Sequence, residues 1–311
     1  MIIVVGDLVT DVLVEHDGPV RAGSDTDAAI RVGGGGQAAN TAAWLAHAGH
    51  PVTLVSAVGD DAAGRDRVAE LSGAGVRCAV QVCPGAATGS VVVLTSAGER
   101  TMITDRGASL LLGPAHVTSV IDDAPAGTHV HLSGYPLLHA GSRDAGLAAL
   151  AAAARRGLPV SVDAASAAPL RSVGATAFLA WVRGVALLLC NADEADVLAG
   201  PSVADPDPSA LPGGPDPSAL RGAGAQARRL TAHVANAVVK QGAAGSVWAG
   251  RDGSVFAGRA RAVPMKDPTG AGDAFAAGLL AAWCSGAAPA AALAAGAELG
   301  ARAVSVLGAR P

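Results

Sequence analysis

Residues 267–275 read Asp-Pro-Thr-Gly-Ala-Gly-Asp-Ala-Phe, a run of small residues that leads straight into an apolar stretch. The pattern over residues 271–284 predicts a helix. Backbone N–H groups in the first turn of a helix have no partner within it, and the helix dipole places partial positive charge there. Glycines let a phosphate approach this backbone closely. The motif therefore predicts an anion site at the start of a helix.

Asp273 lies in the first turn of this predicted helix, beside the anion site. A carboxylate here can take the proton from an attacking hydroxyl. The amides of Gly270, Ala271 and Gly272 can then stabilise charge on a moving phosphoryl group. An aspartate in a first turn can also simply cap the helix. The residues alone leave both interpretations open: a phosphoryl-transfer site, or a capped helix after a tight turn.

Upstream of the motif, short apolar runs alternate with helical stretches. The runs that predict strands of one sheet are 2–5, 52–58, 128–132, 160–162, 185–190 and 237–240. Such alternation predicts an α/β fold with a mostly parallel sheet and helices on both faces, and ligands of such sheets bind beyond the carboxyl ends of the strands. Polar residues gather at those ends: Asp7, Asp11, Asp163, Asn191, Glu194 and Lys240.

Two segments lie outside this alternation and hold paired short strands. They are residues 12–32 and residues 88–105, and they predict a small second sheet inserted in a single domain of residues 1–311. A third segment, 201–218, is rich in proline and glycine and contains most of two copies of Pro-Asp-Pro-Ser-Ala-Leu. It predicts a flexible surface insertion, because this composition blocks both helix and sheet ladders. We expect deletion of residues 205–217 to leave activity roughly unchanged.

Composition excludes several classes of protein. Half of the residues are hydrophobic and the net charge is −4, which argues against a disordered chain and against a dedicated nucleic-acid binder. The longest apolar stretch, 274–284, falls short of the ~20 residues that a membrane span needs. The four cysteines form no Cys-x-x-Cys pair. We therefore expect a cytoplasmic protein with no nucleic-acid and no membrane partner.

The motif at 267–273 resembles the C-terminal signature of the PfkB (ribokinase-type) carbohydrate kinases. Four further stretches are similar to elements of that family, in the same order: Gly35-Gly36-Gln37-Ala38-Ala39-Asn40, Val58-Gly59-Asp60-Asp61-x-x-Gly64, Asn191-Ala192-Asp193-Glu194 and Val239-Lys240-Gln241-Gly242-x-x-Gly245. The resemblance implies a ribokinase-like three-layer αβα domain with a small β-sheet lid. It also implies ATP-dependent phosphorylation of a hydroxyl group of a small sugar or sugar acid.

The resemblance assigns roles to individual residues. Asp273 would be the general base, with Gly270, Ala271 and Gly272 as the anion hole. The nucleotide would bind along three residues: Lys240, Gly242 and Gly245. Asn191 and Glu194 would help to place Mg²⁺ through water, which suits an ion that prefers oxygen ligands and keeps several waters. The substrate would meet five residues: Asp11, Gly35, Gly36, Asn40 and Arg106.

The family resemblance extends to ions and partners. Asp267 and Thr269 match positions where relatives bind a monovalent cation such as K⁺, together with the stretch 303–308. Many relatives dimerise through the lid, so we expect a homodimer. Arg106 stands where acid-sugar kinases of the family use an arginine for a carboxylate, and a solvated surface arginine is the equal alternative.

Three alternative functions remain at this point. A nucleoside kinase of the same superfamily is disfavoured because only 3% of the residues are aromatic. Gly34-x-Gly36-x-x-Ala39 superficially fits a dinucleotide fingerprint, but no acidic residue ends the next strand. A sugar-binding regulator without catalysis is disfavoured by the joint presence of Asp273, Asn191 and Glu194. His129 and His131 share a strand face and read as structural.

Overall fold

The computed structural model describes residues 1–96, 99–201 and 217–311. In this described part a central sheet is built from β1 (Ile2–Val5), β4 (Val52–Gly59), β5 (Arg77–Cys83), β8 (His129–Ser133), β9 (Val160–Asp163), β10 (Leu187–Asn191), β11 (Asn236–Lys240), β12 (Ser246–Gly250) and β13 (Val255–Gly258). Their order is β13-β12-β11-β10-β9-β8-β1-β4-β5. Neighbours run parallel except for β11–β12 and β12–β13. The expected mostly parallel sheet is confirmed.

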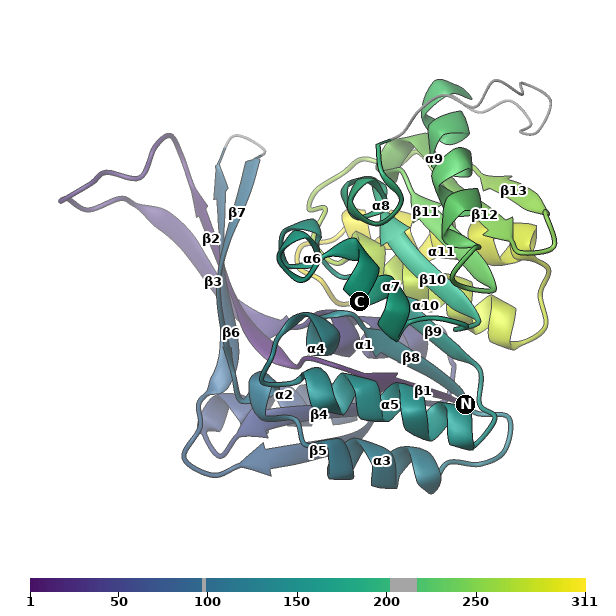
Figure 1. Cartoon of the computed structure of the whole chain (residues 1–311). Helices are drawn as coiled ribbons and strands as arrows, with labels where there is room; N and C mark the ends of the chain where they lie inside the picture. The colour runs from purple at the N-terminus through teal and green to yellow at the C-terminus, as the bar shows by residue number, and fades with distance from the viewer. Residues whose placement is uncertain (97–98, 202–216) are drawn as a thin grey trace.

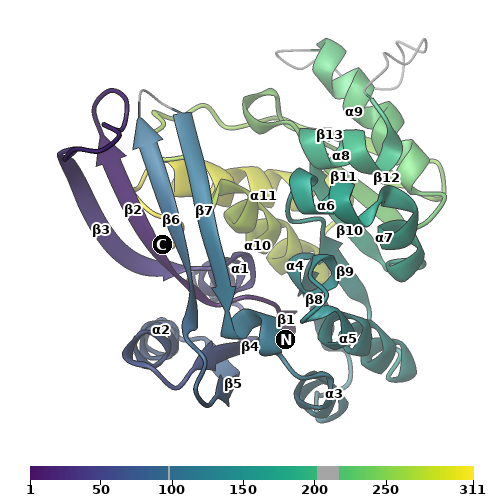
Figure 2. The ribbon, with the colours of Figure 1, turned by 60° about the vertical axis from the view of Figure 1, so that its left-hand side comes forward.

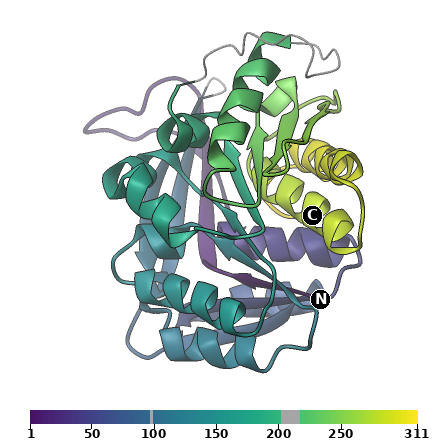
Figure 3. The same cartoon turned by 45° about the vertical axis from the view of Figure 1, so that its right-hand side comes forward.

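Helices cover both faces of this sheet (Figure 1, Figure 3). One face is covered by α3 (Pro114–Asp122), α4 (Tyr135–Leu138), α5 (Arg143–Arg155), α6 (Ala167–Val173), α7 (Ala175–Trp181), α8 (Ala192–Ala199) and α9 (Pro217–Leu230). The other is covered by α1 (Gln37–His47), α2 (Ala62–Gly73), α10 (Ala271–Cys284) and α11 (Pro289–Val304). Side chains of β1 alternate between the two cores, with Ile3 and Val5 in the first and Ile2 and Val4 in the second. The three-layer architecture is confirmed.

A second sheet projects from one side of this body (Figure 1). Its strands are β2 (Val9–His16), β3 (Ala28–Gly35), β6 (Thr88–Ser96) and β7 (Glu99–Gly107), in the order β3-β2-β6-β7. The four strands lie side by side in Figure 2. This is the small second sheet expected from residues 12–32 and 88–105, with longer strands than the sequence predicted. We call it the lid sheet.

Some elements have no counterpart in the sequence prediction. The edge strand β5 mixes polar and apolar residues, so no clear pattern marks it. Helix α9 begins at Pro217 and overlaps the end of the predicted insertion, because proline is tolerated in the first turn of a helix. The rest of that insertion, residues 202–216, lies outside the described residues. Among the described helices, none combines the length and the apolar character that crossing a membrane requires.

Candidate active site

The start of α10 is shaped by Gly270, which has left-handed backbone angles (φ 74°, ψ 0°). A Cβ at this position would lie 2.5 Å from the carbonyl oxygen of Ala309, so only glycine fits the turn. Within the described residues no side chain caps this helix. Asp273 therefore does not act as a cap, and the capping interpretation of the motif is not supported. The backbone N–H groups in the first turn of α10 are therefore not taken up by a side-chain cap, as an anion site requires.

Asp273 faces α1 instead of its own helix start. Nδ2 of Asn40 donates a hydrogen bond to Oδ2 of Asp273 at 2.9 Å. Loss of solvent around this half-buried carboxylate raises its pKa to about 8, the Asn40 hydrogen bond opposes the rise, and the charge of Asp163 adds to it. A carboxylate with such a pKa is suited to accept a proton near neutral pH.

Lys240 is the last residue of β11, and its side chain also approaches the first turn of α10. Its Nζ lies 2.7 Å from Oδ2 of Asp163, at the end of β9. A Cβ on Gly272 would lie 3.5 Å from this nitrogen, which puts the ammonium group beside the first turn of α10. Burial disfavours the charge of Lys240, but the carboxylates of Asp163 and Glu194 outweigh burial and raise its pKa. A permanent cation therefore stands beside the anion site.

Four of the residues predicted to bind the substrate also come together near Asp273, and we call this group the substrate floor. A Cβ on Gly35 would overlap the carboxylate of Asp11, so this aspartate lies directly over the glycine backbone. Gly36 begins α1 with φ 101°, and a Cβ there would press on the carbonyl of Asp7. Asn40 follows in the first turn of α1. The structure thus brings Asp11, Gly35, Gly36 and Asn40 together near Asp273.

Arg106 lies beside this floor, at the end of β7. Its Nη1 is 3.8 Å from Oδ2 of Asp7, and its guanidinium lies 3.9 Å from the ring centre of Tyr135. The Tyr135 ring also stacks on His139 at 6.2 Å. These four residues line a small pocket together with Ser109. Arg106 is thus part of a pocket wall, and the solvated alternative is wrong, since only 18% of its side chain is exposed.

Asn191 and Glu194 bond chiefly to each other. Oδ1 of Asn191 accepts a hydrogen bond from the Glu194 amide at 2.9 Å, and Oε2 of Glu194 accepts one from the Asn191 amide at 2.8 Å. This is a capping box at the start of α8. Burial raises the pKa of Glu194 to about 7. Across the described chain, no cluster of three or more His, Cys, Asp or Glu side chains is arranged to hold a metal ion. The oxygen atoms of Asn191 and Glu194 are of the kind that Mg²⁺ prefers, and both side chains already take part in the capping box.

The remaining predicted residues lie at two turns. Oδ1 of Asp267 accepts from the amide and hydroxyl of Thr269, and its Oδ2 accepts from the amide of Gly308 at 2.9 Å. The two segments expected to form a cation site are therefore adjacent. Gly242 (φ 52°) and Gly245 (φ 113°) form the turn after β11, and a Cβ on Gly245 would collide with the Gly258 carbonyl.

Comparison with known proteins identifies the family to which the chain belongs. The model of the pfkB family of carbohydrate kinases matches residues 1–311. The chain belongs to this family. No curated protein matches it.

Solved structures agree on the fold of this PfkB-family chain. Adenosine kinase from Sinorhizobium meliloti is 21% identical with a TM-score of 0.82, over 100% of this chain and 95% of that one. Ribokinase from Arabidopsis thaliana, complexed with ribose and ATP, is 23% identical with a TM-score of 0.79, over 99% and 93%. A putative ribokinase II from E. coli in complex with ATP and Mg²⁺ is 22% identical with a TM-score of 0.78, over 99% and 94%. The expected ribokinase-like fold is confirmed.

Sequence reasoning missed several residues of this PfkB site. Asp163 ends β9 and Asp7 follows β1, and the sequence marks both only as polar residues near strand ends. In the structure Asp163 pairs with Lys240, and Asp7 accepts a hydrogen bond from the Gln37 amide. Gln37 donates to Oδ1 of Asp163 at 3.0 Å, and no sequence pattern marks this bond. Arg310 donates to Asn40 from a position far along the chain, which no spacing could predict.

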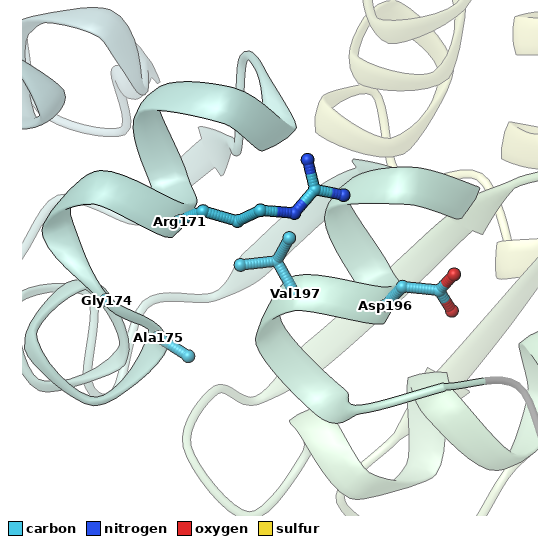
Figure 4. A pocket seen from close by; sticks show the side chains of 5 residues that line it. All are labelled: Arg171, Gly174, Ala175, Asp196 and Val197. Atoms are coloured by element: carbon cyan, nitrogen blue, oxygen red, sulfur yellow. The ribbon is translucent and has the colours of Figure 1, made fainter.

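Two other features include none of the predicted site residues. His129 and His131 both bond to Oγ of Ser161 at 2.8 Å, and burial lowers their pKa values to about 3 and about 4. They are structural, as expected. A hollow between α6 and α8 is lined by Arg171, Gly174, Ala175, Asp196 and Val197 (Figure 4). It contains none of the predicted site residues.

Proposed function

We propose that this chain transfers the γ-phosphoryl group of ATP to a hydroxyl group of a small sugar or sugar acid. The observation that carries the proposal is the pairing of a proton acceptor with an anion site. Asp273 lies in the first turn of α10, which no described side chain caps, and the ammonium group of Lys240 stands beside Gly272. This arrangement suits proton removal and charge stabilisation in phosphoryl transfer.

In this proposal Asp273 takes the proton from the acceptor hydroxyl. Asp11 accepts hydrogen bonds from further hydroxyl groups, and Asn40, whose amide already bonds to Asp273 and Arg310, offers its second N–H as a donor. The amides of Gly270, Ala271 and Gly272, with Lys240, stabilise negative charge near the start of α10. Gly242 and Gly245 would give the nucleotide a surface without side chains. When bound near Asn191 and Glu194, Mg²⁺ would neutralise phosphate charge.

A sugar is favoured over a nucleoside by the pocket beside Asp7. A nucleobase is often held by stacking on an aromatic ring. Tyr135 is the sole tyrosine, and its ring already stacks on the Arg106 guanidinium and on His139. Arg106 could instead bind a substrate carboxylate, which supports a sugar acid.

An acceptor screen tests the proposal. ATP consumption is measured over sugars, sugar acids and nucleosides, with and without Mg²⁺. We expect ADP formation that depends on a sugar or sugar acid, and an Arg106→Met variant that loses preference for acidic acceptors. Turnover confined to nucleosides would replace the proposed substrate class, and ATP use with no acceptor at all would contradict the transfer reaction. Comparing K⁺ with Na⁺ tests the cation site at Asp267 and Thr269.

We also propose that two copies pair through their lid sheets. One face of the lid sheet carries the row Val32, Val12, Val92 and Ile103 on its four strands. The two outer members are exposed, Val32 at 66% and Ile103 at 59%. An aliphatic face of this kind is costly in water. Light scattering should give the mass of a dimer, and a monomer would contradict this pairing.

A further inference from the structure

The segment 308–310 lies across the catalytic motif and is fixed at each residue. The amide of Gly308 donates to Oδ2 of Asp267 at 2.9 Å. The carbonyl oxygen of Ala309 accepts a hydrogen bond from Nε1 of Trp44 at 2.9 Å. Arg310 then reaches from this anchored backbone toward α1. The side chain is 14% exposed, so it belongs to the interior of the site and not to the surface.

Three groups hold the Arg310 guanidinium in place. Its Nε donates to Oδ1 of Asn40 at 3.1 Å, and its Nη2 donates to the carbonyl of Gly35 at 2.8 Å. Its Nη1 is 3.7 Å from Oε2 of Glu70. A Cβ on Gly34 would overlap the guanidinium and also press on Oε2 of Glu70, so the Arg310 head group lies directly against this glycine. Burial lowers the pKa of Arg310 to about 10, which still leaves it charged at neutral pH.

The direction of these hydrogen bonds decides how the Asn40 amide is turned. Arginine can only donate, so the carbonyl end of Asn40 must face Arg310. The NH₂ end must then face Asp273, where it donates at 2.9 Å. A free asparagine could turn over and present its carbonyl to the carboxylate, which would disfavour the ionised form.

We propose that Arg310 is a positioning residue that fixes the Asn40 amide against Asp273 and so favours the ionised, proton-accepting form of this carboxylate. The inference rests on the proposed function, in which Asp273 is the base. Other charged or titratable groups face Asp273 from the neighbouring elements, and the effect of Arg310 adds to theirs: Asp7, Tyr135, Asp163 and Lys240.

The pH profile of acceptor kcat/KM tests the inference with Arg310→Leu. Loss of the donor and of the positive charge both raise the pKa of Asp273. We expect the acid limb to move up by about one pH unit, a tenfold loss of activity on the acid side that disappears at high pH. An unchanged profile, or a loss equal at every pH, would overturn the positioning role. Arg302→Gln is the matched control, because this arginine of α11 is 59% exposed.

Gly34→Ala tests the geometry without removing the charge. The added methyl group displaces the guanidinium, so we expect the acid limb to shift in the same direction as in Arg310→Leu. Gly73→Ala is its control, since a Cβ there has nothing within 4 Å. A normal profile for Gly34→Ala with an altered one for Arg310→Leu would show a charge effect alone and contradict positioning.

A double-mutant cycle with Asn40→Ala completes the test. If Arg310 acts through Asn40, adding Arg310→Leu to Asn40→Ala moves the acid limb much less than Arg310→Leu alone moves it. Equal shifts in both backgrounds would overturn the inference. Wild-type protein without turnover on any acceptor would instead mean that the proposed function has failed.

Discussion

The starts of helices α8 and α10 carry similar polar residues in opposite arrangements. At α8, Asn191 and Glu194 satisfy each other and the helix start in a capping box. At α10, Gly270 holds the cap position, no described side chain caps the helix, and Asp273 turns to Asn40. A closed helix start stabilises the fold, whereas an open one can receive an anion. In the proposed function, the start of α8 therefore supports the fold and the start of α10 takes part in the reaction.

The contrast between the starts of α8 and α10 predicts that Asp273→Asn has the largest effect on activity. Loss of the base should lower kcat by at least about 10³-fold, within the range of general-base catalysis. ATP affinity measured by calorimetry should stay within a few-fold, because the motif places Asp273 as base and not as anchor. Near-normal turnover would remove Asp273 from the base role.

The same variant should change the pH dependence of folding stability. The pKa of Asp273 is raised to about 8 in the folded chain, so the folded state binds more protons than the unfolded state between about pH 4 and pH 8. Stability from this group therefore falls as pH rises through that window. Asp273→Asn should flatten the decline in urea unfolding; an identical slope in both proteins would contradict the burial of this charge.

Lys240→Met tests the cation that both helix starts share. The KM for ATP should rise about tenfold, consistent with the loss of one charge-assisted contact. Asp163 is left without its cation, and breaking such a buried pair costs about 3–5 kcal/mol of unfolding free energy. Lys240→Met with Asp163→Asn should recover stability but not the ATP KM. Recovery of both would show that Lys240 serves the fold only.

Asp11→Ala tests whether the residues beside the start of α10 serve binding of the acceptor and not the catalytic step. Asp11 lies over Gly35 and is not itself part of α10, so the acceptor KM should rise about tenfold, equivalent to one charged hydrogen bond. The kcat should change much less. Steady-state kinetics with the identified acceptor measures both, and an unchanged KM would take Asp11 out of the site.

Asn191→Ala opens the closed helix start and should have the smallest effect. Loss of an N-cap costs about 1 kcal/mol of stability. If Asn191 also helps to place Mg²⁺, the Mg²⁺ concentration for half-maximal activity should rise, with kcat at saturating Mg²⁺ nearly normal. A stability loss with no change in Mg²⁺ requirement would leave α8 a purely structural partner.

Local patterns predicted most of the fold and part of the site. The strand ends and the glycine-rich start of α10 are marked within a few residues of sequence, and the family motifs placed Asp11, Asn40 and Asp273. Contacts between distant segments have no such mark. The Lys240–Asp163 pair joins residues 77 positions apart, and Arg310 meets Asn40 across 270 positions. Only folding brings them together.

The most direct measurement follows transfer of labelled γ-phosphoryl from ATP to the acceptor in a single turnover. Wild-type protein and Asp273→Asn are compared at equal ATP occupancy. The account predicts labelled phosphorylated acceptor from the wild type and at least about 10³-fold slower transfer by the variant. Equal transfer rates, with ATP bound equally well, would contradict a base at the open start of α10.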